Sequence, residues 1–204
     1  MSGRISADNS IREGVILANI NSEATGKEYQ NAVKLLGREP RTPFLVKTRC
    51  PDGSPQVLVA EPVFLEDGIW KPFPAFIWLV CPRLKQLVAV LEQQGYVRSF
   101  SARLEEDADF RDKFLSGQVE IAAIRVEMAE KVYPGELPEH IREVLGETTV
   151  AGSRDFRGVK CLHAHLAHEL AYGGNPIGAE VLKMIGNCSP ADDCGSILYD
   201  GGSK

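Results

Sequence analysis

Strand-like segments are gathered early in this chain, and helical patterns fill most of the later residues, which restricts the folds open to it. Residues 44–48, 56–60 and 75–80 are rich in apolar and β-branched side chains, as strands are, and 75–80 lacks alternation, as in a strand buried on both faces. Helical apolar spacing predicts helices at 23–36, 83–94, 101–115, 119–132, 139–145, 160–172 and 176–185. Strands followed by a run of helices favour an α+β fold over alternating α/β. We therefore expect a small antiparallel sheet of about three strands, packed with several helices in a single domain.

The connections between these segments suggest where the domain begins and ends. Residues 50–55 contain the glycine and prolines of a tight turn, so strands 44–48 and 56–60 form a predicted hairpin. Residues 66–72 are expected to be a loop, and Gly117 is expected to separate two helices. We predict an appendage at 1–22, one α+β domain at 23–186, and a mobile polar tail at 187–204.

Composition excludes several classes of function. The 204 residues are 44% hydrophobic and 25% charged, which is typical of one soluble globular domain. A net charge of −5 argues against nucleic acid as a partner. No apolar run reaches membrane-spanning length, and the first residues lack an apolar signal core. We expect a cytoplasmic protein, in which the five cysteines are free thiols or metal ligands and not disulfides.

Metal-binding side chains are concentrated between residues 158 and 170. This stretch holds three of the four histidines and one of the five cysteines. On a helix, Cys161, His165 and His168 have i, i+4, i+7 spacing and share one face. Thiolate and imidazole are preferred ligands of zinc and related metals. The pattern predicts a metal site, although single cysteines are more often small buried hydrophobes.

Two further cysteines follow predicted strands. Cys50 follows the first strand and Cys81 follows the third, and in an up-down-up meander those strand ends meet at one edge of the sheet. The two strands are then roughly 10 Å apart, a gap that two inward-pointing cysteine side chains nearly close. If the 160–172 helix packs across this edge, zinc is bound by residues of that helix and of the sheet edge: Cys50, Cys81, Cys161, His165 and His168. An iron–sulfur cluster on the three cysteines is the alternative.

Two residues near these ligands are candidates for catalysis. Glu169 follows His168 and is placed to act as a base beside a metal-bound water, although a solvated helix-face glutamate is the simpler interpretation. His163 points about half a turn away from Cys161 and either supports a ligand, contacts a substrate or belongs to the core. The choice between His163 and His165 as ligand rests on the helical face, which favours His165. The tail cysteines Cys188 and Cys194 are expected to be exposed thiols or a labile disulfide, with a last ligand from a folded-back tail as the alternative.

An ordered series of short motifs is similar to one known family. The motifs lie at residues 36–40, 49–55, 72–74, 78–84, 158–165, 167–168 and 175–178; their sequences are LGREP, RCPDGSP, PFP, WLVCPRL, GVKCLHAH, AH and NPIG. They resemble the uncharacterised bacterial family known as domain of unknown function 501, over roughly residues 34–186. The resemblance implies a bacterial protein and carries no activity, cofactor or ligand assignment.

Three classes of function remain open from the sequence. The leading hypothesis is a metal-dependent hydrolase, in which a metal activates water against a phosphorylated or nucleotide substrate; its partner is then a small molecule. The second is a non-catalytic module stabilised by a metal or an iron–sulfur cluster, which acts through interaction. The third is a metal-free domain whose thiols and histidines line a pocket for a small organic ligand. Whether the protein is an enzyme is left undecided by the sequence.

Overall fold

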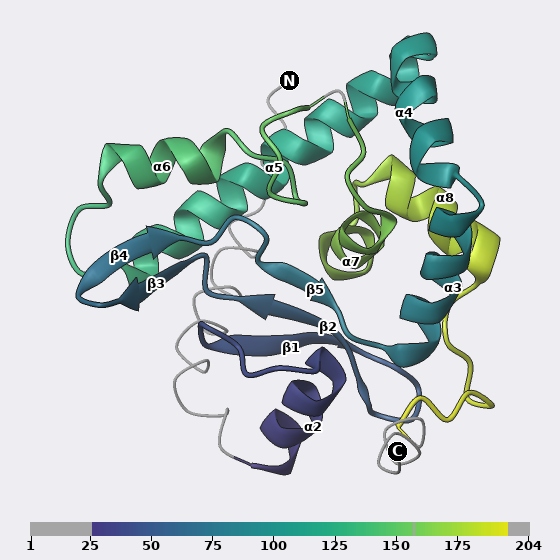
Figure 1. Cartoon of the computed structure of the whole chain (residues 1–204), viewed down its shortest axis with the longest axis horizontal. Helices are drawn as coiled ribbons and strands as arrows, with labels where there is room; N and C mark the ends of the chain where they lie inside the picture. Colours follow the sequence, from purple (N-terminus) through teal and green to yellow (C-terminus); the bar gives the residue numbers. More distant parts are fainter. Residues whose placement is uncertain (1–25, 157, 196–204) are drawn as a thin grey trace, which may run out of the picture.

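Three antiparallel strands form the sheet at the centre of the molecule. The computed structural model describes residues 26–156 and 158–195 (Figure 1). The strand order is β1 (Phe44–Arg49), β2 (Pro55–Ala60), β5 (Ile77–Leu79), and β2 pairs with both neighbours. Because the chain runs up, down and up through this sheet, the last residues of β1 and of β5 lie at the same end of the sheet. This end is called the shared strand edge below. The sequence-based prediction of a shared strand edge is confirmed.

Strand β2 is buried on both faces, and this fixes the layers of the fold. Its side chains alternate between two cores: Val57 and Val59 belong to the large core, whereas Leu58 and Ala60 belong to a smaller one. Helix α2 (Lys27–Leu36) covers the smaller core, and α7 (Leu162–Tyr172) packs on the opposite face. Figure 1 shows α2 below the sheet and α7 above it. A central strand with two covered faces requires apolar residues at every position, not an alternating pattern.

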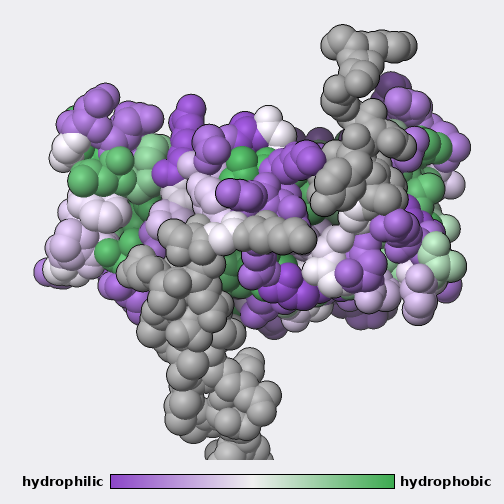
Figure 2. All heavy atoms as spheres, turned by 90° about the horizontal axis from the view of Figure 1, so that it is seen from below, coloured by the Kyte–Doolittle hydropathy of each residue, from purple (hydrophilic) through white to green (hydrophobic). Residues whose placement is uncertain are grey.

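A second, two-stranded sheet occupies the region expected to be a loop. Strands β3 (Val63–Glu66) and β4 (Ile69–Pro72) form a hairpin around Asp67 and Gly68, whose φ angles are 53° and 76°. Asp-Gly between strand-forming residues is a strong signal for a tight hairpin turn, and it explains why residues 66–72 are not the expected loop. Leu65 and Ile69 near the turn are 57% and 62% exposed, and Figure 2 shows apolar surface at this end of the molecule.

The helices cover the sheet and carry most of the core. Besides α2, they are α3 (Pro82–Gln93), α4 (Tyr96–Glu106), α5 (Ala108–Val132), α6 (Glu139–Gly146), α7 and α8 (Pro176–Ile185). With the two small sheets they make a single compact α+β domain, as the sequence predicts. Residues 1–22, the predicted appendage, lie outside the described residues. Within the described part of the chain, no helix combines the length and the hydrophobicity that crossing a membrane requires.

The break between two helices expected at Gly117 lies instead at Asp107. The Asp107 carboxylate accepts a hydrogen bond from the Phe110 N–H at 3.0 Å and so caps the start of α5. Helix α5 then continues through Gly117, which is buried. A Cβ atom added at Gly117 would lie 2.3 Å from the carbonyl oxygen of Gly174. Glycine at this position does not end a helix. It permits a close approach between α5 and residues 173–175, the link before α8.

Candidate metal centre

Cys50 and Cys81 meet at the shared strand edge, as the sequence predicts. Cys50 directly follows β1 and begins a turn in which its N–H donates to the Ser54 carbonyl at 2.9 Å. Cys81 follows β5 and precedes Pro82, the first residue of α3. The Cys81 N–H donates to the Gln56 carbonyl at 3.2 Å, which anchors the start of α3 to β2. Both cysteines are buried.

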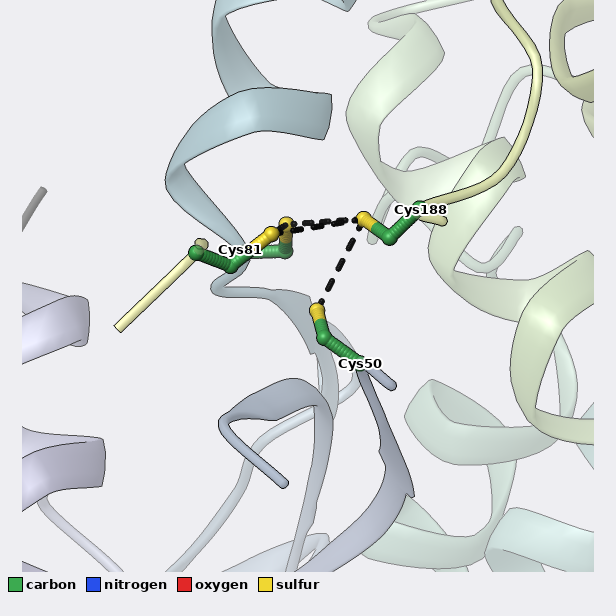
Figure 3. A group of neighbouring side chains, drawn as sticks. Cys50, Cys81 and Cys188 are labelled. Atoms are coloured by element: carbon green, nitrogen blue, oxygen red, sulfur yellow. Dashed lines mark hydrogen bonds between the residues drawn. The ribbon is translucent and has the colours of Figure 1, made fainter. Parts of the chain in front are cut away.

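Two cysteines from the end of the chain complete the group. The segment after α8 descends beside α3 to the end of the sheet (Figure 1) and brings Cys188 and Cys194 to the other two thiols. The Cys188 sulfur lies 3.7 Å from that of Cys50 and 3.5 Å from that of Cys81. The Cys194 sulfur lies 3.7 Å from that of Cys81 and 3.6 Å from that of Cys188. Figure 3 shows the sulfurs of Cys50, Cys81 and Cys188 directed toward one another.

The spacing of these sulfurs matches the ligand set of one tetrahedral ion. All four sulfur atoms lie within 4.8 Å of one another. A tetrahedral zinc–thiolate site with bonds of about 2.3 Å places its sulfurs about 3.8 Å apart. An iron–sulfur cluster divides its thiolates among several irons, so that sulfurs on different irons stand much farther apart. The four thiols therefore lie close enough together to hold a single ion such as zinc, whereas a cluster would require the site to open.

Hydrogen bonding within the group makes one of these thiols unusually acidic, although burial acts in the opposite direction. Cys50, Cys81 and Cys194 are 3%, 0% and 0% exposed, and Cys188 is partly exposed. A hydrogen bond from the Cys50 thiol, helped by the Leu84 N–H at the start of α3, lowers the pKa of Cys81 to about 5. The same hydrogen bond to Cys81, together with burial, raises the pKa of Cys50. Burial is the main reason that the pKa values of Cys188 and Cys194 are raised. Without a metal the group thus favours one thiolate surrounded by thiols.

Carboxylates organise the two polar loops that carry three of the cysteines. Asp52, in the turn after Cys50, accepts hydrogen bonds from the N–H of Ser54 at 2.9 Å and of Gly195 at 2.8 Å. Burial acts to raise the pKa of Asp52, but these backbone hydrogen bonds outweigh it and lower the pKa. Asp192, between Cys188 and Cys194, accepts from the Ser189 N–H at 2.7 Å, which is the main reason that its pKa is lowered. The exposed-thiol expectation is wrong for Cys194, which is buried within this folded segment.

The structure places the other predicted ligands outside the cysteine group. Among residues 26–156 and 158–195, the one group suited to a metal consists of four cysteines and includes neither Cys161 nor a histidine. Cys161 precedes α7, where the next residue's N–H donates to Glu92 at 2.7 Å. Glu92 and Cys81 stand at opposite ends of α3, a helix of 12 residues and so about 18 Å long. Cys161 is partly exposed, and burial of its thiol raises its pKa.

The two buried histidines of α7 share one partner, Asn175. The Asn175 side-chain oxygen accepts from the Gly178 N–H at 2.9 Å, so its amide nitrogen is the end that faces the rings. That nitrogen lies 3.1 Å from Nδ1 of His165 and 2.9 Å from Nδ1 of His168. Burial lowers the pKa of His165 to about 3 and that of His168 to about 4, so both rings are neutral near pH 7. In each ring Nδ1 accepts from Asn175 and Nε2 carries the proton, so neither ring has a free lone pair for a metal. The two histidines instead attach α7 to the start of α8 through Asn175.

The two predicted catalytic residues lie apart from each other. His163 places Nδ1 3.1 Å from the Glu92 carboxylate and Nε2 3.2 Å from the Lys85 carbonyl, so it binds α7 to α3. Glu169 accepts a hydrogen bond from the Asn175 N–H at 2.8 Å. It borders a hollow of about 360 Å³ between α5, α7 and α8, and no cysteine lines this hollow. The structure does not bring Glu169 or His163 into the cysteine group.

The sequence contains only a weak signal for Cys188 and Cys194 as ligands. Two cysteines in a polar, glycine-containing tail with no CxxC pair match no standard zinc motif. Their position depends on a tertiary contact, the 2.8 Å hydrogen bond from the Gln56 side chain to the Asn187 side chain, which fixes the chain just before Cys188. The number of cysteines is the signal that could have indicated this group. Four of the five lie outside the predicted helix 160–172: two follow strands, and the other two are close together in the sequence.

Comparison with known families places this chain in one of them. A family model described as "Protein of unknown function (DUF501)" matches residues 46–183, more than half of the chain, so the protein belongs to the DUF501 family. The match includes Cys50 and Cys81 and ends before Cys188. No curated protein and no solved structure matches the chain. The resemblance inferred from the motifs is confirmed, and the centre's chemistry has to be argued from its geometry.

Proposed function

We propose that this DUF501 protein binds one zinc ion through Cys50, Cys81, Cys188 and Cys194, and that the ion is structural. The observation that carries the proposal is the sulfur spacing, with four distances between 3.5 and 3.7 Å. Such a site joins the chain after α8 to the sheet edge and to the start of α3. The ion then replaces the apolar packing that a short polar segment does not supply by itself.

The ligand set favours a structural role over hydrolysis. Structural zinc sites are closed by four protein ligands, whereas catalytic sites have three and leave one position for water or substrate. Here a fourth cysteine fills the tetrahedron. Glu169, the predicted base, contacts the Asn175 backbone beside a separate hollow and not the thiols. A metal-dependent hydrolase therefore has less support than a metal-stabilised module.

Metal analysis of the native protein tests this proposal. The full chain should be purified without oxygen and without a metal-binding tag, and its metals quantified together with the visible spectrum. We expect one zinc per chain and no colour. Absence of bound metal in freshly prepared protein would contradict the proposal, and iron with sulfide would replace zinc by a cluster.

A matched pair of variants tests which thiols bind the ion. Cys81→Ser should lose zinc and unfold at a lower temperature, because three thiolates remain and a hydroxyl replaces the fourth. Cys161→Ser removes a thiol at the start of α7, beside the end of α3 that lies opposite Cys81, and should retain one zinc per chain. Zinc content measured on both, with thermal unfolding, separates the two. Loss of zinc from Cys161→Ser but not from Cys81→Ser would transfer the site to α7.

A further inference from the structure

The cysteine loops are connected by polar contacts that do not involve the sulfurs. One contact is the 2.8 Å hydrogen bond from the Gly195 N–H to Asp52, which joins the turn after Cys50 to the residue after Cys194. Another is the ion pair of 3.0 Å between Arg83 and Asp192, which joins the first turn of α3 to the loop between Cys188 and Cys194. Each contact therefore links the loop of one cysteine to the segment of another.

Each carboxylate also shapes its own loop. Asp52 accepts from both the N–H and the hydroxyl of Ser54, at 2.9 and 3.1 Å, which closes the turn that begins at Cys50. Asp192 accepts from both the N–H and the hydroxyl of Ser189, at 2.7 and 2.9 Å, and these bonds close a turn between Cys188 and Cys194. Each carboxylate thus combines a local turn with a contact to the opposite loop.

Electrostatics alone does not account for two aspartates at this place. A zinc ion with four thiolates carries a net charge of about −2, and nearby carboxylates repel it. The positive charge of Arg83 offsets part of this negative charge. Its Nε pairs with Asp192, but its buried Nη1 has no hydrogen-bond acceptor among the described residues, so Asp192 does not satisfy every donor of the guanidinium. The placement of the carboxylates is better explained by geometry than by charge.

We propose that Asp52 and Asp192 are positioning residues, which hold the four thiols in their tetrahedral arrangement before the metal binds. This inference rests on the proposed zinc site and deepens it. Ordering the loops in advance removes an entropic cost from metal binding, so the affinity depends on residues that never touch the ion. If the carboxylates acted only through charge, their removal would tighten zinc binding. Positioning and charge repulsion therefore predict effects of opposite sign.

Zinc affinity measured by competition with a chromophoric chelator tests this difference. In the full chain, Asp52→Ala and Asp192→Ala should each bind zinc about 10- to 100-fold more weakly. Asp192→Asn, which can still accept from Ser189 but loses the charge facing Arg83, should fall between them and the unmodified chain. Glu127→Gln breaks an exposed ion pair of 2.7 Å with Lys131 on α5 and serves as the control with unchanged affinity. Unchanged or tighter binding in both alanine variants would overturn the inference while leaving the zinc site in place.

Hydrogen exchange of the unmodified chain provides a test that needs no variant. After zinc is removed, the amides of Gly195 and Ser189 should still exchange slowly, because Asp52 and Asp192 hold them without the ion. Exchange at the rate of an unstructured chain, with protection appearing only when zinc is added, would show that the ion orders the loops. An unmodified chain that binds no zinc at all would overturn the proposed function and this inference together.

Discussion

Burial and a shared hydrogen-bond partner decide what the histidines of α7 do. Their spacing on one helix face is that of metal ligands, yet His165 and His168 are 1% and 2% exposed and both face Asn175. The spacing placed His165 and His168 on one face correctly, but Cys161 precedes the helix in extended backbone and is not part of that face. The shared partner Asn175 also caps α8 through Gly178. An asparagine that satisfies two rings and a helix start at once arises from the packing of two helices, which no local pattern shows.

The neutral histidines predict a loss of stability in mild acid. Their pKa values in the folded protein, about 3 and 4, lie below the value of about 6.5 for an exposed histidine. As pH falls below about 6.5 the unfolded chain binds protons that the folded chain does not, so the free energy of unfolding decreases, by up to about 1.4 kcal/mol per pH unit for each histidine. The decrease continues until each folded-state pKa is reached.

Denaturant unfolding of the zinc-loaded protein between pH 7 and pH 5 measures this effect. His168→Asn should have a shallower pH dependence than the unmodified chain, because one fewer proton separates the folded and unfolded states. His140→Asn, which alters an exposed residue of α6, is the control. The thiols are common to all three proteins, so any contribution they make to the slope cancels in the comparison. Equal slopes in the His168→Asn and unmodified proteins would contradict the burial argument.

At the scale of elements, close approach overrides intrinsic helix preference in α5. The sequence placed helical segments at both ends of this helix but divided it at Gly117, since glycine disfavours helices. The structure shows that α5 continues and that the Gly174 carbonyl lies where a Gly117 side chain would be. Arg125, also on α5, is fully buried and donates to the carbonyls of Leu145 and Pro74, both at 2.7 Å. Such contacts become visible only when distant segments are in place.

Two helical glycines provide a matched test of this close approach. Gly117→Ala should destabilise the protein by about 1–3 kcal/mol, because backbone must move to admit the methyl group, despite the higher helix preference of alanine. Gly146→Ala, at the end of α6, meets nothing within 4 Å and should be neutral or stabilising by up to about 1 kcal/mol. Chemical denaturation of both gives the comparison. A stabilising Gly117→Ala would show that α5 and the link before α8 are not in close contact.

At the scale of the whole molecule, the centre joins segments from the early and late parts of the described chain. The strand patterns at 44–48, 56–60 and 75–80 predicted the sheet and the shared edge of Cys50 and Cys81, because strand order in a meander follows the chain. The approach of Cys188 and Cys194 was not predictable in the same way. It depends on where α8 ends in space and on the contact between Gln56 and Asn187, neither of which the tail sequence encodes locally.

X-ray absorption at the zinc edge of the native protein tests the central claim most directly. We expect one zinc per chain, coordinated by four sulfurs at about 2.3 Å and by no nitrogen or oxygen. Such a spectrum would match the tetrahedral spacing of Cys50, Cys81, Cys188 and Cys194. A coordination sphere with fewer than four sulfurs, completed by histidine nitrogen or by water, would contradict it. That result would return the site to the histidines of α7 and restore an open position for catalysis.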